Sequence, residues 1–370
     1  MEDNMSTKRF DVVGSFLRPE NLKKARADFE AGKISVEEFS KIKKEAIKAL
    51  VEKQKAAGLP YITDGEYNRK FWHLDFFWGF EGIDHKKDGG GVQFNGEVAD
   101  LEDTYLVGKL KAKIHPFVED FKFVKSLESE GFEAKQTIPS PAQLFQQLNI
   151  PKNYEGTRKI YPTNDELIQD IGKAYQQVIK QLYDAGCRTI QFDDCTWGAI
   201  VGDAAAQRYK LLGDLKEVKE QLLKVNNLAI EGKPADLKIN THICRGNYHS
   251  TYFTSGPYDG VAGYVFAKEN VNTLYLEYDD ERSGGFEPLA HVSSDKKVVL
   301  GLITSKRPEL EDKATVIARI KEASKYIPLD RLLLSPQCGF ASCEIGNKLT
   351  EEQQWAKIQL VHEIAEEVWG

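Results

Sequence analysis

The sequence lacks the features of a membrane-spanning, secreted or nucleic-acid-binding protein. No stretch approaches the roughly 18 consecutive apolar residues of a membrane helix, and residues 1–6 contain no apolar core of a signal peptide. Charges of both signs are mixed along the chain, and their sum is −7. Nucleic-acid binding instead needs clustered Lys and Arg to neutralise phosphates. We therefore expect a cytoplasmic protein that binds neither membranes nor nucleic acids.

Cysteine is also scarce, since the 370 residues contain five. An odd and small number fits free or metal-bound thiols in a reducing compartment better than a disulfide framework. The sequence shows no internal repeat, low-complexity segment or Pro/Gly-rich linker, and its 41% of hydrophobic residues can form a large core. We predict a single catalytic domain over residues 1–370 and leave open whether it forms a homo-oligomer.

Strand-like apolar runs alternate with helix-like segments along the chain. Capping signals at Ser35, Thr163 and Thr350 begin three of the predicted helices. The apolar runs give eight strand ends, nearly all followed at once by polar, Gly or metal-ligand residues: Val13, Thr63, Ile138, Phe192, Asn240, Leu276, Ile303 and Leu334. A doubly wound sheet could also supply such units. The count favours an α/β fold of the (β/α)8 TIM-barrel type, in which all eight ends meet at the active-site face.

Residues 75–135 interrupt this alternation after the second predicted strand. The segment overlaps an aromatic-rich strip, Phe71–Phe80, and contains weak strand-like alternation at 92–94 and 105–107. We predict a hairpin-bearing insertion here. It either contributes to substrate binding or only packs, because aromatic clusters are more often core than ligand platforms.

Four residues at predicted strand ends could form a zinc site: His242, Cys244, Glu277 and Cys338. The side chains of His242 and Cys244 leave the same side of an extended segment, because they lie two residues apart. Glu277 and Cys338 could complete a tetrahedral site from neighbouring strands. The alternative is one packed Cys, one surface Cys and a hydrogen-bonded His.

The charge of this ligand set narrows the chemistry. Two thiolates and one carboxylate on a dication leave a net charge of −1, which makes the metal a poor Lewis acid but keeps a bound thiol deprotonated. Such a site suits alkyl transfer to sulfur, whereas water activation usually uses His-rich sets. Glu66 and Asp193 could pair with a substrate ammonium, and the backbone near Ser15 could donate to its carboxylate. Strand-end caps and salt bridges are the alternatives.

Six stretches resemble the catalytic, zinc-bearing half of cobalamin-independent methionine synthase, and especially the short, single-barrel members of that family. They occur in the family's order and are Gly14-Ser15-Phe16-Leu17-Arg18-Pro19, Asp64-Gly65-Glu66, Ile190-Gln191-Phe192-Asp193-Asp194, His242-Ile243-Cys244-Arg245-Gly246-Asn247, Leu276-Glu277-Tyr278-Asp279 and Pro336-Gln337-Cys338-Gly339-Phe340. The resemblance implies a (β/α)8 barrel and an activity like that of 5-methyltetrahydropteroyltriglutamate–homocysteine S-methyltransferase, with homocysteine as methyl acceptor and methionine as product.

The resemblance also implies roles for individual residues. The Zn²⁺ ligands are then His242, Cys244, Glu277 and Cys338. Glu66 and Asp193 are catalytic positions that hold the homocysteine ammonium, and Ser15 belongs to the segment that meets its carboxylate. Cys187, Cys195 and Cys343 match no ligand position, and we interpret them as structural or incidental.

Three departures from the long family members concern mainly the methyl donor. The additional N-terminal barrel that helps hold polyglutamylated folate is missing from the sequence. Ile303-Thr304-Ser305-Lys306-Arg307 stands where the long form has Ile-His-Ser-Pro-Arg, whose His is thought to protonate the departing folate. The acidic pair is Asp193-Asp194 rather than Asp-Glu. A methylated corrinoid or a sulfonium would tolerate the loss of that His, so a folate, a corrinoid and a sulfonium remain candidate donors.

Other functions on the same fold compete with this interpretation. One is a thiol alkyltransferase with a different acceptor, and another is a zinc lyase or hydrolase. A lyase like uroporphyrinogen decarboxylase needs no zinc ligand set, so the His-x-Cys pair with the distant Cys338 argues against it. The last is a non-catalytic zinc- or thiol-responsive protein, in which the acidic strand-end residues would have no role.

Overall fold

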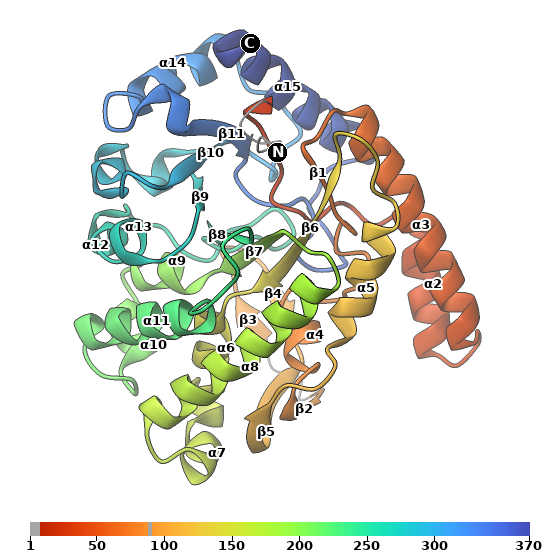
Figure 1. Ribbon diagram of the computed structural model, residues 1–370, viewed down its shortest axis with the longest axis vertical. Coiled ribbons are helices and arrows are strands. Elements are labelled where there is room, and N and C mark those ends of the chain that lie inside the picture. Colours follow the sequence, from red (N-terminus) through yellow and green to blue (C-terminus); the bar gives the residue numbers. More distant parts are fainter. Residues whose placement is uncertain (1–7, 88–90) are drawn as a thin grey trace.

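Parallel strands form the centre of the computed structural model, which describes residues 8–87 and 91–370 (Figure 1). Seven strands pair in the order β1-β6-β7-β8-β9-β10-β11, and every neighbouring pair is parallel. Their bounds are β1 Tyr61–Ile62, β6 Glu133–Pro139, β7 Thr189–Asp194, β8 Lys238–Ile243, β9 Thr273–Glu277, β10 Lys297–Ile303 and β11 Leu332–Pro336. Seven of the eight predicted strand ends therefore lie within or directly beside an observed strand.

The eighth position of the barrel is taken by the segment around Phe10, which forms an isolated parallel bridge with Leu334. Asp11 N donates to Leu334 O at 3.0 Å, and Leu334 N donates to Arg9 O at 3.1 Å. On its other side the segment approaches β1 through Thr63, whose hydroxyl donates to Gly14 O at 3.3 Å. The predicted TIM-barrel fold is confirmed, with its first strand reduced to a bridge.

Helices surround the sheet, as Figure 1 shows. The longer ones are α2 Glu20–Glu30, α3 Val36–Ala56, α5 Pro116–Lys125, α6 Pro141–Leu148, α7 Pro151–Ile160, α8 Asn164–Asp184, α11 Leu215–Ala229, α14 Lys313–Ala323 and α15 Glu351–Trp369. Short turns of helix are α4 Leu74–Phe77, α9 Thr196–Ile200, α10 Ala205–Tyr209, α12 Asp259–Ala262 and α13 Val265–Lys268, with 3-10 turns at Glu281–Ser283, Glu287–His291 and Leu329–Arg331. The predicted caps are present, because Ser35, Thr163 and Thr350 each accept from the backbone N–H three residues later.

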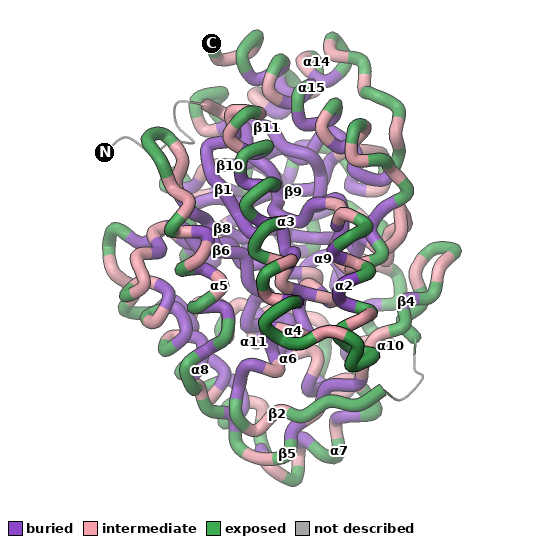
Figure 2. Tube along the Cα trace, turned by 90° about the vertical axis from the view of Figure 1, so that its right-hand side faces the viewer, coloured by how far each residue is buried: buried purple, intermediate pink, exposed green. Residues whose placement is uncertain are grey.

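The main core lies between the strands and the surrounding helices. Figure 2 shows the buried strands at the centre, with the exposed residues on the outer faces of the helices. Helix α8 presents a fully buried apolar stripe to this core, at the helical spacing seen in the sequence: Leu167, Ile171, Tyr175, Val178 and Leu182. These contacts fix the positions of the strand ends that carry the polar residues.

The interior of the barrel contains a smaller apolar cluster and a buried ion pair. The cluster consists of Val13, Tyr61, Tyr275, Val299 and Leu333. Lys135 Nζ lies 2.6 Å from Asp11 Oδ2, and neither side chain is exposed. Tyr275 also donates to that Asp11 oxygen at 2.6 Å. Because a buried charge without a partner is costly, this pair fixes the N-terminal segment in the barrel despite its short pairing with Leu334.

Antiparallel strand pairs lie between β1 and β6, in the segment 75–135 that the sequence predicts to be a hairpin-bearing insertion. Two antiparallel pairs occur there: β2 (Glu81–Lys86) with β5 (Asp103–Lys111), and β3 (Gly91–Gln93) with β4 (Val98–Asp100). The turn after β3 contacts the barrel loops, because Asn95 N donates to Tyr252 O at 3.0 Å. Residues 88–90 of this segment lie outside the described part.

The described residues contain no helix that combines the length and apolar character needed to cross a bilayer. The N-terminal residues 1–6, for which we predict no signal-peptide core, lie outside the described ranges.

Candidate metal centre

Four side chains from the ends of three strands, β8, β9 and β11, meet at the carboxyl end of the barrel. His242 is the second-last residue of β8, and Cys244 directly follows that strand. Glu277 ends β9, and Cys338 lies two residues after the end of β11. One ligand atom from each lies within 4.8 Å of those of the other three, and all four residues are buried. The two sulfurs, Cys244 Sγ and Cys338 Sγ, are 3.8 Å apart. The four residues predicted from the sequence as a ligand set are therefore brought together.

The donor set of this cluster fits a thiophilic metal such as zinc. Both ring nitrogens of His242 are buried and have no hydrogen-bond partner, although a buried imidazole normally has at least one. A metal ion bonded to one of them would explain that. Two thiols, an imidazole and a carboxylate at these separations match the residue types and number of a tetrahedral zinc site.

Backbone contacts hold the thiol and carboxylate groups in place. Gly246 N donates to Cys244 Sγ at 3.3 Å, and Arg245 N donates to Glu277 Oε1 at 3.0 Å. Helix α9 packs closely over this turn, because a Cβ on Gly198 would lie 2.1 Å from Cys244 O. Gly198 therefore permits a close approach that any larger residue would prevent.

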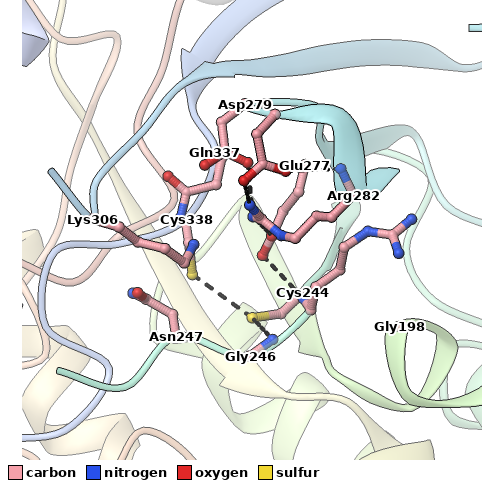
Figure 3. A network of polar contacts seen from close by, with 12 residues as sticks. Gly198, Cys244, Gly246, Asn247, Glu277, Asp279, Arg282, Lys306, Gln337 and Cys338 are labelled. Carbon is pink, nitrogen blue, oxygen red and sulfur yellow. Dashed lines mark hydrogen bonds and ion pairs between the residues drawn. The ribbon is translucent and has the colours of Figure 1, made fainter. Parts of the chain in front are cut away.

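Two cations, Arg282 and Lys306, act on the charge of Glu277, and Figure 3 shows both beside the cluster. Arg282 Nη2 is 2.9 Å from Glu277 Oε2, and the same guanidinium pairs with Asp279 at 2.7 Å and with Asp280. Lys306 also acts on Glu277: burial alone would raise the pKa of Glu277, but Lys306 and Arg282 outweigh it and lower that pKa below its usual value. Lys306 Nζ is itself buried and has no hydrogen-bond partner.

A cavity of about 580 Å³ opens onto the cluster. His242, Cys244 and Cys338 line it, whereas Glu277 does not and is fully buried. A ligand in the cavity can therefore reach the site only from the side away from Glu277. This volume falls in the range of small-molecule binding sites.

The predicted substrate-binding residues Ser15, Glu66 and Asp193 line the same cavity. Glu66 Oε1 lies 3.4 Å from Arg69 Nη1, while Glu66 Oε2 is buried without a partner. Burial raises the pKa of Glu66 to about 7, with Arg69 opposing the rise and Asp193 adding to it. Burial likewise raises the pKa of Asp193 to about 7, against a hydrogen bond from Gln191 at 2.8 Å. Two such carboxylates in one cavity suit a cationic group of a ligand.

Ser15 is tied to the loop that carries Cys338. Its hydroxyl accepts from Ala341 N at 3.3 Å, and its carbonyl accepts from Phe340 N at 2.9 Å. A Cβ on Gly339 would lie 1.8 Å from Ser15 Oγ, so the two loops touch. The first and last strands thus contribute to one wall of the cavity.

Some cavity residues were not predicted from the sequence. Cys195 and Cys343 line the cavity. Cys195 directly follows β7, so its strand-end position was an available signal. Cys187 lies in the main core, as a structural role requires. The outer wall comes largely from the aromatic strip, the insertion and neighbouring loops, and includes Trp72, His73, Val92, Phe94, Leu101, Arg208 and Phe253.

Comparisons with known proteins agree on one family. The model of the cobalamin-independent synthase catalytic domain matches residues 9–84 and 158–366. The uncharacterized protein YxjG of Bacillus subtilis is 44% identical over 98% of this chain and 94% of its own. A methionine synthase of Saccharolobus solfataricus is 27% identical over 89% of this chain and 86% of its own. A crystal structure described as "the Putative Vitamin-B12 Independent Methionine Synthase from Listeria monocytogenes" has a TM-score of 0.77, at 36% identity and 98% coverage of both chains.

Proposed function

Because the chain belongs to the cobalamin-independent methionine synthase family through its catalytic domain, we propose that it transfers a methyl group to the thiol of homocysteine and forms methionine. The observation that carries the proposal is the buried His242, Cys244, Glu277 and Cys338 cluster at the floor of a cavity. The same cavity holds two carboxylates that match the ammonium of an amino-acid substrate. No other cluster of this composition occurs among the described residues.

We propose zinc as the metal, held by these four side chains. Bound zinc lowers the pKa of a coordinated thiol, so that the acceptor sulfur is a thiolate at neutral pH. The ligand set adds a net negative charge, which keeps that sulfur nucleophilic and disfavours activation of water.

The protein's own residues orient the acceptor. Glu66 and Asp193 bind the homocysteine ammonium through charge-assisted hydrogen bonds, and the segment at Ser15 meets the carboxylate. Glu66 and Asp193 line one cavity with Cys244 and Cys338, which supports a bound acceptor whose sulfur lies next to the two thiols. The acceptor gives up its thiol proton to solvent, a new S–CH3 bond forms, and the electron pair of the broken bond remains with the donor.

The outer part of the cavity is the site for the methyl donor. Trp72, Phe94 and Phe253 supply aromatic surface there, which suits a donor with an apolar or flat body. A folate of the 5-methyltetrahydrofolate type, a methylated corrinoid and a sulfonium are the candidate donors. A different thiol acceptor is the alternative for the other half of the reaction.

A product assay tests this proposal. Zinc-loaded protein is incubated with homocysteine and a deuterated methyl donor, and labelled methionine is measured by mass spectrometry. Cys338→Ser should abolish product formation, whereas Cys343→Ser, which changes a cavity thiol outside the cluster, should retain it. Absence of labelled methionine with every donor, or equal activity in Cys338→Ser, would contradict the proposal.

A further inference from the structure

Glu277 occupies a different position from the other three residues of the cluster. It is fully buried and does not line the cavity, whereas His242, Cys244 and Cys338 do. A substrate sulfur that reaches the metal from the cavity approaches from the opposite side. If Glu277 gives up its place to that sulfur, its carboxylate must remain in the protein interior.

A buried carboxylate needs a compensating cation, because an unpaired charge in a low-dielectric interior is strongly unfavourable. Arg282 already contacts Glu277 Oε2 at 2.9 Å. However, this guanidinium also pairs with Asp279 and Asp280. One positive charge therefore faces two other carboxylates, and it cannot alone balance a third.

Lys306 supplies the missing charge. Its side chain reaches the network from the loop after β10, while Arg282 enters from the other side (Figure 3). The ammonium is buried, has no hydrogen-bond partner, and is not part of the cavity lining. Its backbone is held firmly, since Lys306 N donates to Thr304 Oγ1 at 3.3 Å and Asn347 Nδ2 donates to Ser305 O at 2.8 Å. The Lys306 ammonium is therefore available to pair with the Glu277 carboxylate if that carboxylate leaves the metal.

We propose that Lys306 is a positioning residue that, together with Arg282, receives the Glu277 carboxylate when the acceptor sulfur takes its place on the metal. This inference rests on the proposed function. Lys306 does not touch the substrate, and its effect is to make the ligand exchange favourable. It should therefore change homocysteine binding much more than zinc binding.

The test compares Lys306→Met with the wild-type protein in two titrations. Homocysteine affinity of the zinc-loaded protein is measured by calorimetry, and zinc affinity of the metal-free protein is measured by competition with a chelator. Loss of one charge-assisted hydrogen bond should weaken homocysteine binding by about tenfold or more. Zinc affinity should stay within about twofold or increase, because Glu277 loses its alternative partner.

Two further variants complete the design. Lys306→Arg keeps the charge and should restore homocysteine affinity. Lys296→Met removes another buried lysine, at the opposite end of β10, where Nζ contacts Ser293, and should leave both affinities unchanged. If Lys306→Met does not fold by circular dichroism, Lys306→Gln replaces it in the same comparison.

The outcomes distinguish a failure of the role of Lys306 from a failure of the proposed function. Unchanged homocysteine affinity in the folded Lys306 variant would overturn the role of Lys306, as would a parallel loss of zinc affinity. Wild-type protein that binds zinc but shows no zinc-dependent binding of homocysteine would overturn the proposed function, and with it the role of Lys306.

Discussion

Cys244 Sγ and Cys338 Sγ lie 3.8 Å apart, although their residues are 94 positions apart in the chain. The barrel accounts for this proximity, because β8 and β11 both end at the same face. Neither thiol is in a disulfide. Together with the unpartnered imidazole of His242, the two thiols line the cavity as part of a cluster that could hold a metal ion.

Removal of one thiol should release the metal. Cys338→Ser should lower zinc affinity by more than about a hundredfold, since even outer partners of metal ligands contribute 10–100-fold. Cys343→Ser is the control, because that thiol lines the cavity outside the cluster. Zinc content after dialysis, measured by elemental analysis, checks both variants. Stoichiometric zinc in Cys338→Ser would exclude it as a ligand.

Glu66→Gln should weaken homocysteine binding by about tenfold or more, because it removes a charge-assisted contact with the ammonium. Glu269→Gln is a matched control. Glu269 is also a buried carboxylate, and burial raises its pKa to about 8, but it binds Thr241 and Asn226 behind the strands. Calorimetric titration with homocysteine measures the effect. Equal weakening in both variants would indicate a general loss of structure instead.

When both proteins are free of substrate, the same Glu66→Gln variant should be more stable to unfolding at pH 8 than the wild type. Burial raises the folded-state pKa of Glu66 to about 7, so the folded protein binds more protons than the unfolded chain between about pH 4.5 and 7. Wild-type stability therefore falls as pH rises through that window, and the variant avoids this loss, on the order of 2 kcal/mol. Thermal unfolding at pH 5 and 8 measures it. A stability difference that shrinks toward pH 8 would contradict the assignment.

Folate should be a poor donor compared with methylcobalamin or S-methylmethionine. A departing folate amine must be protonated, and Thr304-Ser305-Lys306 after β10 offers no imidazole, while the Lys306 ammonium does not line the cavity. Initial rates of methionine formation with each donor, using folates of one and three glutamates, check this. Folate turnover equal to or above that of the other donors would contradict it.

Thr163→Ala should destabilise the protein by about 1 kcal/mol without affecting zinc content, because it removes an N-cap. Thr163 Oγ1 accepts from Glu166 N at 3.3 Å, and Glu166 Oε2 accepts from Thr163 N at 3.2 Å. Urea unfolding of the zinc-loaded protein measures the change. An unchanged midpoint would show that tertiary contacts alone position helix α8.

The sequence was sufficient to predict the barrel and the set of four clustered residues. The barrel follows from local patterns, namely apolar runs and the residues that directly follow them, and a barrel brings such positions to one face. The choice of the four residues also rested on the resemblance to the family. The sequence was not sufficient to predict which charged groups surround Glu277. Whether Lys306 points toward that carboxylate or toward solvent depends on how the loop after β10 packs against Gln337 and Asn347, which spacing along the chain does not encode.

The outer wall of the cavity was beyond prediction for a similar reason. Trp72 and Phe94 lie in an aromatic strip and a hairpin whose composition equally suits a packed core. Their contact with the cavity follows from the way the β3–β4 hairpin meets the loop at Tyr252. The reduced first strand was also missed, because its bridge to Leu334 is supported by the buried Asp11–Lys135 pair rather than by an extended ladder.

Zinc K-edge absorption spectroscopy tests most directly whether this site activates the homocysteine thiol. The zinc-loaded protein should show two sulfur ligands, from Cys244 and Cys338, and addition of homocysteine should add a third with loss of one oxygen ligand. A spectrum that stays unchanged when homocysteine is bound would contradict the account.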